Sequence, residues 1–137
     1  MARATASGGY LVLEEFDDLT ASLAFGRDEH VARHAQVLAA KQAAFAAAGH
    51  RNHIARHLPA KPNATGAFPS SAAGHVAVRQ DGAGTDPWLR YLRNQTAPLL
   101  ETAHVDKARL QAYADQLRDL SFLYFAPMLV SVVAQKL

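Results

Sequence analysis

Hydrophobic residues gather in two short runs near the ends of the chain. The first, Tyr10 to Phe16, shows no polar alternation before its acidic end and follows a Gly8-Gly9 turn. The second begins near Pro127 and ends by Lys136. Apolar runs of this kind are typical of strands that are covered on both faces. A further strand is predicted around His75-Val76-Ala77-Val78.

Between these strands the apolar residues recur at helical spacing. One helix is predicted from Asp28 to Ala48, with Gly49 as its stop. A second starts at Asp86-Pro87 and continues to Leu100, and a third follows the capping residue Asp106. The predicted buried stripes of the three helices are, in order, Val31, Ala35, Leu38 and Phe45; Trp88, Leu92, Gln95 and Leu99; and Leu110, Tyr113, Ala114 and Leu117.

The segment between the first helix and the middle strand allows two interpretations. Asn52 can cap a short helix that has Ile54 and Leu58 on one side. Alternatively, Pro59 can open a new helix as its first residue, although Pro62 would then disturb it.

The composition narrows the classes of function. The chain has 137 residues, half of them hydrophobic, which is enough for one domain with its own core. The net charge is only +2, and no aromatic residues are interleaved with the basic ones for base stacking, so no nucleic-acid partner is expected. The absence of cysteine excludes disulfides and thiol catalysis, and it fits a reducing cytoplasm.

No membrane partner is expected either. No hydrophobic stretch precedes Tyr10, so no signal peptide is predicted. The apolar segment from Leu120 to Val133 has 14 residues and contains Pro127, whereas a membrane span needs roughly 20. We therefore expect a cytoplasmic protein.

The order of these elements resembles the C-terminal half of a class I S-adenosylmethionine-dependent methyltransferase. The segment SGGYLVLEEFD, which ends at Asp17, looks like the family's fifth strand with its glycine turn and acidic end. Pro127 to Gln135 resembles the seventh strand, which runs antiparallel to the rest. Asp28 to Ala48 is similar to the inserted helix over the substrate site, and His57-Leu58-Pro59-Ala60 resembles the start of the helix before the sixth strand.

This resemblance implies a truncated Rossmann-like α/β half-domain over residues 1–137, with a small mixed or antiparallel sheet of about three strands and helices packed on it. It also implies methyl transfer from the cofactor S-adenosylmethionine to a small-molecule acceptor. The family's glycine-rich loop has no counterpart, because Gly82-Ala83-Gly84 does not follow a strand and lacks a third glycine. The isolated chain is therefore expected to be inactive, with no cofactor-binding residues assigned.

The family's fourth strand, which would lie beside Tyr10 to Phe16, is also missing. An unpaired apolar edge recruits another strand or aggregates. We therefore expect a homodimer, or a complex with a partner chain, that covers this edge. The alternative interpretation is a non-catalytic dimerising or interaction protein derived from a methyltransferase. An upstream or partner chain that carries the glycine-rich loop would favour the enzyme over this alternative.

Candidate catalytic residues lie at the end of the first strand and on the helix after it. Glu14 and Glu15 end the strand, outside which ligands bind in open α/β sheets, and they point to opposite faces. His34 belongs to the inserted helix, and histidine suits general-base catalysis near neutral pH. The candidate substrate-binding residues are Asp17, Phe25, Arg27, His30 and Trp88, with Tyr91 and Arg51 as further possibilities.

The histidines also raise the question of a metal site. His30 and His34, like His53 and His57, are spaced four apart, as helical metal ligands often are. Neither pair has a carboxylate at a motif-defining position, so no metal is expected.

Overall fold

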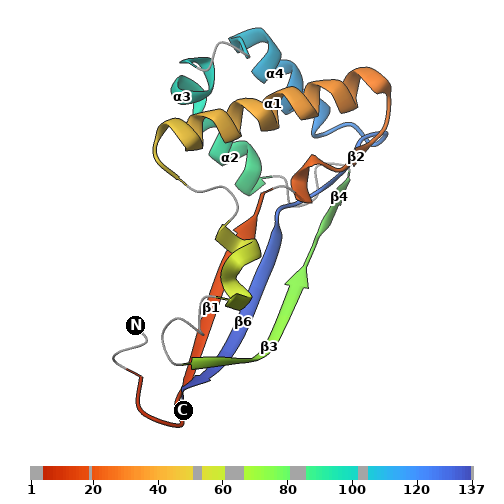
Figure 1. Ribbon diagram of the computed structural model, residues 1–137. Coiled ribbons are helices and arrows are strands. Elements are labelled where there is room, and N and C mark those ends of the chain that lie inside the picture. Colours follow the sequence, from red (N-terminus) through yellow and green to blue (C-terminus); the bar gives the residue numbers. More distant parts are fainter. Residues whose placement is uncertain are drawn as a thin grey trace.

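The structure, a computed structural model, describes residues 5–18, 20–50, 54–60, 67–80, 86–101 and 105–136, and the side chains of 67–70 and 86–88 lie outside this description. Figure 1 shows a long sheet with the helices gathered across one of its ends. In chain order the elements are β1 (Tyr10–Asp17), η2 (Thr20–Ser22), β2 (Ala24–Phe25), α1 (Asp28–Ala47), η3 (Ile54–Ala60), β3 (Ala67–His75), β4 (Val78–Gln80), α2 (Asp86–Asn94), α3 (Thr96–Glu101), α4 (Lys107–Gln116), β5 (Leu123–Phe125) and β6 (Met128–Lys136).

The larger sheet has three strands in the order β1-β6-β3. Both outer strands run antiparallel to β6, which makes β1 and β3 parallel to each other. Asp17, at the carboxyl end of β1, pairs with Met128. His75, at the carboxyl end of β3, pairs with Leu129. The two carboxyl ends therefore lie at the same end of the sheet, next to the helices (Figure 1).

A second small sheet, ordered β2-β5-β4, continues the chain beyond a bend. The bend separates β3 from β4 at Val76-Ala77 and β5 from β6 at Ala126-Pro127. The Ala126 amide still donates to the Ala77 carbonyl at 2.8 Å, but proline has no amide hydrogen to continue the ladder. The prediction of one strand around 75–78 is therefore wrong, because β3 ends at His75 and β4 begins at Val78, with the bend between them.

Helix α1 confirms the first predicted helix and its end. Gly49, just beyond it, has a φ of 80°, the left-handed conformation that terminates helices. The predicted stripe is rotated, however: Ala35 is exposed, whereas His34 and Lys41 are buried. The buried face of α1 thus carries polar groups that hydrophobic periodicity does not select.

Helix α4 and its cap are also confirmed, because Asp106 Oδ1 accepts a hydrogen bond from the Arg109 amide at 2.7 Å. The single helix predicted before it is instead two, α2 and α3, separated at Gln95. Pro98 explains this difference, since it lacks the amide hydrogen that would donate to the Asn94 carbonyl in a continuous helix.

The short helix η3 packs on one face of the large sheet, where Ala55 and Leu58 are buried against Val130 and Val132 of β6. Pro59 lies inside η3 and does not open a new helix. The other predictions that concern this segment, and those for the loop that follows β4, fall on residues outside the described part of the chain: Arg51, Asn52, His53, Pro62 and Gly82-Ala83-Gly84.

The main core lies between the helices and the small sheet. It consists of Val37, Ala40, Leu89, Leu92, Leu99, Val105, Leu110, Tyr113, Leu117, Phe122 and Tyr124. Within the described ranges, no helix is long and apolar enough to cross a membrane. The fold is therefore a mixed α/β one with two small antiparallel sheets and packed helices, as predicted in outline.

The face of the large sheet opposite η3 carries exposed apolar side chains, which we call the open face. Tyr10, Val12 and Phe16 of β1 are 64%, 58% and 57% exposed. Among the described strands, none pairs with the outer edge of β1. The prediction that this strand is covered on both faces is thus wrong for the described part of the molecule, because η3 covers only one.

Candidate functional site

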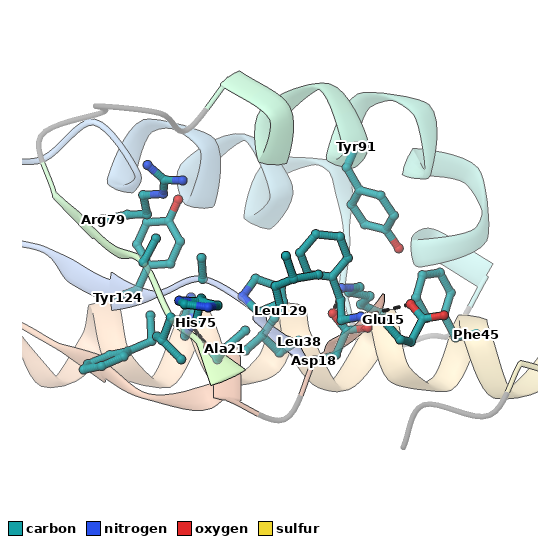
Figure 2. A pocket seen from close by; sticks show the side chains of 18 residues that line it. Glu15, Asp18, Ala21, Leu38, Phe45, His75, Arg79, Tyr91, Tyr124 and Leu129 are labelled. Atoms are coloured by element: carbon teal, nitrogen blue, oxygen red, sulfur yellow. Dashed lines mark hydrogen bonds and ion pairs between the residues drawn. The ribbon is translucent and has the colours of Figure 1, made fainter. Parts of the chain in front are cut away.

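A cavity of about 710 Å³ opens between α1, α2 and the strand ends (Figure 2). Its walls are mostly apolar and aromatic. Pockets of this size hold small organic molecules, and open α/β sheets bind ligands outside the carboxyl ends of parallel strands. The polar residues that line it are Glu15, Asp18, His34, Lys41, His75 and Arg79.

A buried ion pair forms part of the α1 side of this pocket. Lys41 Nζ donates to Asp18 Oδ1 at 2.6 Å. The same ammonium lies 5.3 Å from the ring centroid of Phe45 and 5.2 Å from that of Tyr91, which is cation–π distance. Burial, reinforced by the Asp18 charge, raises the pKa of Tyr91 to about 12. The Tyr91 hydroxyl therefore stays protonated at neutral pH.

His34 lines the pocket, but the protein occupies both of its ring nitrogens. Nε2 lies 2.6 Å from the Ala21 carbonyl oxygen and must donate to it. Nδ1 lies 2.7 Å from the Tyr113 hydroxyl and accepts from it. Burial lowers the pKa of His34, although the bond to Ala21 opposes the shift. The geometry thus makes His34 a neutral residue that holds η2, α1 and α4 together, and neither nitrogen is left for a substrate.

This arrangement predicts an acid-sensitive stability. The pKa of His34 is near 6.5 in the unfolded chain and lower in the native one. Between these two values the unfolded chain binds a proton that the native chain does not, so the free energy of unfolding falls as pH drops below 6.5. The slope is at most about 1.4 kcal/mol per pH unit. Urea denaturation at pH 7.0 and 5.5 measures it. His34→Gln should lose this contribution and the exposed control His57→Gln should keep it; equal slopes in all three proteins would contradict the prediction.

The two predicted strand-end glutamates point to opposite faces, as strand alternation requires. Glu15 lines the pocket, and its Oε1 accepts from the Phe16 amide at 3.0 Å. In the described part of the chain, no cationic side chain forms a salt bridge with Glu15. Glu14 does not line the pocket, and its Oε1 accepts from the Ser131 hydroxyl at 2.7 Å. Of the two carboxylates, only Glu15 is placed to act on a molecule in this cavity.

Asp17 does not line the pocket. Its side chain is 1% exposed, and Oδ2 accepts from Arg56 Nε at 3.0 Å and from the Thr20 hydroxyl at 3.2 Å. A buried carboxylate requires such partners. Asp17 therefore ties the end of β1 to η3 and η2, which is a structural task.

The other predicted substrate-binding residues also lie away from the cavity lining. Phe25 is exposed and packs beside Phe125, with ring centroids 6.2 Å apart. Arg27 bonds to Asp119 at 3.2 Å and to Nε2 of the buried His30 at 2.7 Å. The remaining candidate is Trp88, whose side chain lies outside the described part.

Sequence reasoning missed several pocket residues while including Tyr91. Lys41 could have been found from the sequence, because it falls on one face of α1 with Leu38 and Phe45 at helical spacing. A lysine on an apolar helix face indicates a buried partner or a site. The sequence gives no such signal for Arg79 or His75, because neither belongs to a recognisable motif.

No group of three histidine, aspartate or glutamate side chains suited to a metal ion occurs within the described ranges. Comparisons with protein-family models, curated proteins and solved structures found no match to this chain. The functional argument therefore depends on the pocket and its surroundings.

Proposed function

We propose that this chain forms the acceptor-binding portion of a class I S-adenosylmethionine-dependent methyltransferase that acts on a small molecule. The observation that carries the proposal is the position of the pocket, outside the carboxyl ends of the parallel strands β1 and β3. The antiparallel β6 between them supports it, because the resemblance assigns β1 and β6 to the family's fifth and seventh strands.

The described residues do not fit the cofactor. They contain no glycine-rich turn between a strand and a helix, which is the feature that offers backbone amides to this class of cofactor in doubly wound folds. We therefore propose that another polypeptide segment supplies the cofactor site. The open face and the free edge of β1 are suitable places for it to dock, because both are apolar and exposed.

Within this proposal the chain's own residues bind and orient the acceptor. Methyl transfer is an in-line displacement that relies mainly on positioning two reactants, and the apolar walls provide that positioning. Glu15 is the carboxylate that accepts the proton of the acceptor nucleophile. His34 acts through the fold, by holding Ala21 and Tyr113 in place.

The experiment is methyl transfer from radiolabelled S-adenosylmethionine to a panel of small aromatic acids and phenols. The chain is assayed together with the polypeptide encoded immediately upstream of it. Removing a general base typically costs a factor of about 100 or more, so we expect Glu15→Gln to lower kcat by about that factor. Glu14→Gln is the matched control, because Glu14 does not line the pocket, and it should retain the rate. Equal rates in the two variants, or no transfer in any combination, would overturn the proposal.

The open face also favours a second candidate, a non-catalytic dimerising or interaction protein. Two copies that pair through β1 would bury Tyr10, Val12 and Phe16 without any cofactor. Sedimentation separates the candidates: a stable homodimer that neither binds the loop-bearing polypeptide nor transfers methyl groups supports the second.

A further inference from the structure

The charged groups of the pocket are not balanced along its length. Lys41 and Asp18 neutralise each other at 2.6 Å. Arg79 is different: in the described part of the chain, no carboxylate forms a salt bridge with it. Figure 2 shows Arg79 beside Tyr124, well separated from Glu15, with Leu129 and Leu38 between them. The cavity thus has Arg79 at one end and Glu15 at the other, with Leu129, Leu38 and the His75 imidazole between them.

The cationic end is suited to a carboxylate. Arg79 is partly buried and lines the cavity. A guanidinium presents a planar fork of donors that matches a carboxylate with two parallel hydrogen bonds. A cation that has lost part of its water and has no protein counter-ion interacts more strongly with an anionic ligand than an exposed one does.

The middle of the cavity is suited to a flat apolar body. Leu38 and Leu129 lie there (Figure 2), and the rings of Phe125 and Tyr124 and the Val76 side chain also belong to the cavity lining. A cavity of about 710 Å³ holds a one- or two-ring molecule with room for a second reactant. Apolar walls of this kind bind such rings through burial of their surface.

We infer that the pocket selects aromatic carboxylates, with Arg79 as the residue that binds the carboxylate and the reacting end directed toward Glu15. This inference rests on the proposed function for its use of the pocket as an acceptor site. Ligand binding, however, can be measured without methyl transfer, so the two can fail separately.

The test is calorimetric titration of the purified chain with three matched probes: 2-naphthoate, 2-naphthalenemethanol and 2-naphthylmethylammonium. A charge-assisted hydrogen-bonded pair is worth about tenfold or more in affinity, so naphthoate should bind about tenfold more tightly than the alcohol, and the ammonium should bind most weakly. Arg79→Gln should remove the preference of naphthoate over the alcohol while leaving binding of the alcohol unchanged. Arg79→Lys should retain part of the preference, because the charge remains without the planar fork.

Arg90→Gln is the control, since Arg90 is exposed on α2 and does not line the pocket. It should keep the full preference, and circular dichroism should show that every variant folds. Equal affinity for naphthoate and the alcohol in the native chain, a preference that survives Arg79→Gln, or no binding of any probe would each overturn the inference. Selective naphthoate binding without methyl transfer would leave the inference standing and remove the proposed function. Methyl transfer to the phenols of the panel, with none to the aromatic acids, would remove the inference and leave the proposed function standing.

Discussion

On its own, the chain is expected to bind S-adenosylmethionine with a dissociation constant on the order of 1 mM or weaker, which corresponds to about 4 kcal/mol of binding free energy. In doubly wound folds the affinity for such a cofactor comes largely from backbone amides of the glycine-rich loop and from an acidic partner for the ribose. Within the described ranges, no glycine-rich turn joins a strand to a helix, so we expect the chain alone to lack most of this binding energy.

Isothermal titration of the chain alone, and then with the polypeptide encoded upstream, measures this effect. Addition of a loop-bearing polypeptide should tighten binding by about a thousandfold, to roughly micromolar dissociation constants. The control is the same polypeptide with its loop glycines replaced by alanine, which should not restore binding. Micromolar affinity for the chain alone would show that it contains a complete cofactor site and would refute the half-enzyme reading.

The second large effect concerns stability and His34. We expect His34→Ala to lower the free energy of unfolding by about 3–5 kcal/mol, as truncation of a large buried ring does. The ring is 1% exposed and packs among Phe122, Tyr124 and Tyr113. Truncation leaves a cavity and removes the hydrogen-bond partners of Tyr113 and the Ala21 carbonyl, and unsatisfied buried groups add to the cost.

Chemical denaturation at pH 7 compares this variant with His57→Ala, in which an exposed ring is removed from η3. Exposed substitutions usually change stability by less than about 0.5 kcal/mol. If His34→Ala were as stable as His57→Ala, the structural task assigned to His34 would be wrong, and a role as a general base would again be open.

Local sequence was enough to predict the elements whose signals lie within a few residues. The apolar runs predicted β1 and β6, Gly49 predicted the end of α1, and Asp106 predicted the start of α4. Each depends on backbone conformation or on a side chain that bonds to its own neighbours. The same local rules missed the corner between the sheets, because it depends on Pro127 interrupting a ladder with a distant strand.

The site was predictable only in part. Alternation along β1 separates Glu14 from Glu15 by sequence alone, but the sequence does not say which of them faces a cavity, since that depends on where α1 and α2 pack. Asp17 looked like a strand-end ligand and is instead buried against Arg56, which is 39 residues away.

The sequence by itself determined β1, β6, α1 and α4, because periodicity, turn residues and capping residues are local properties. Tertiary structure alone decided the chemistry of the pocket. It brings Lys41 to Asp18, which is 23 residues away in the sequence, to form an ion pair. It also brings the Tyr113 hydroxyl, 79 residues away, into a hydrogen bond with His34 Nδ1. Whether an ionisable group is available to a ligand depends on such distant partners. Burial and hydrogen bonding within the protein set its charge and decide which of its donors and acceptors are already in use.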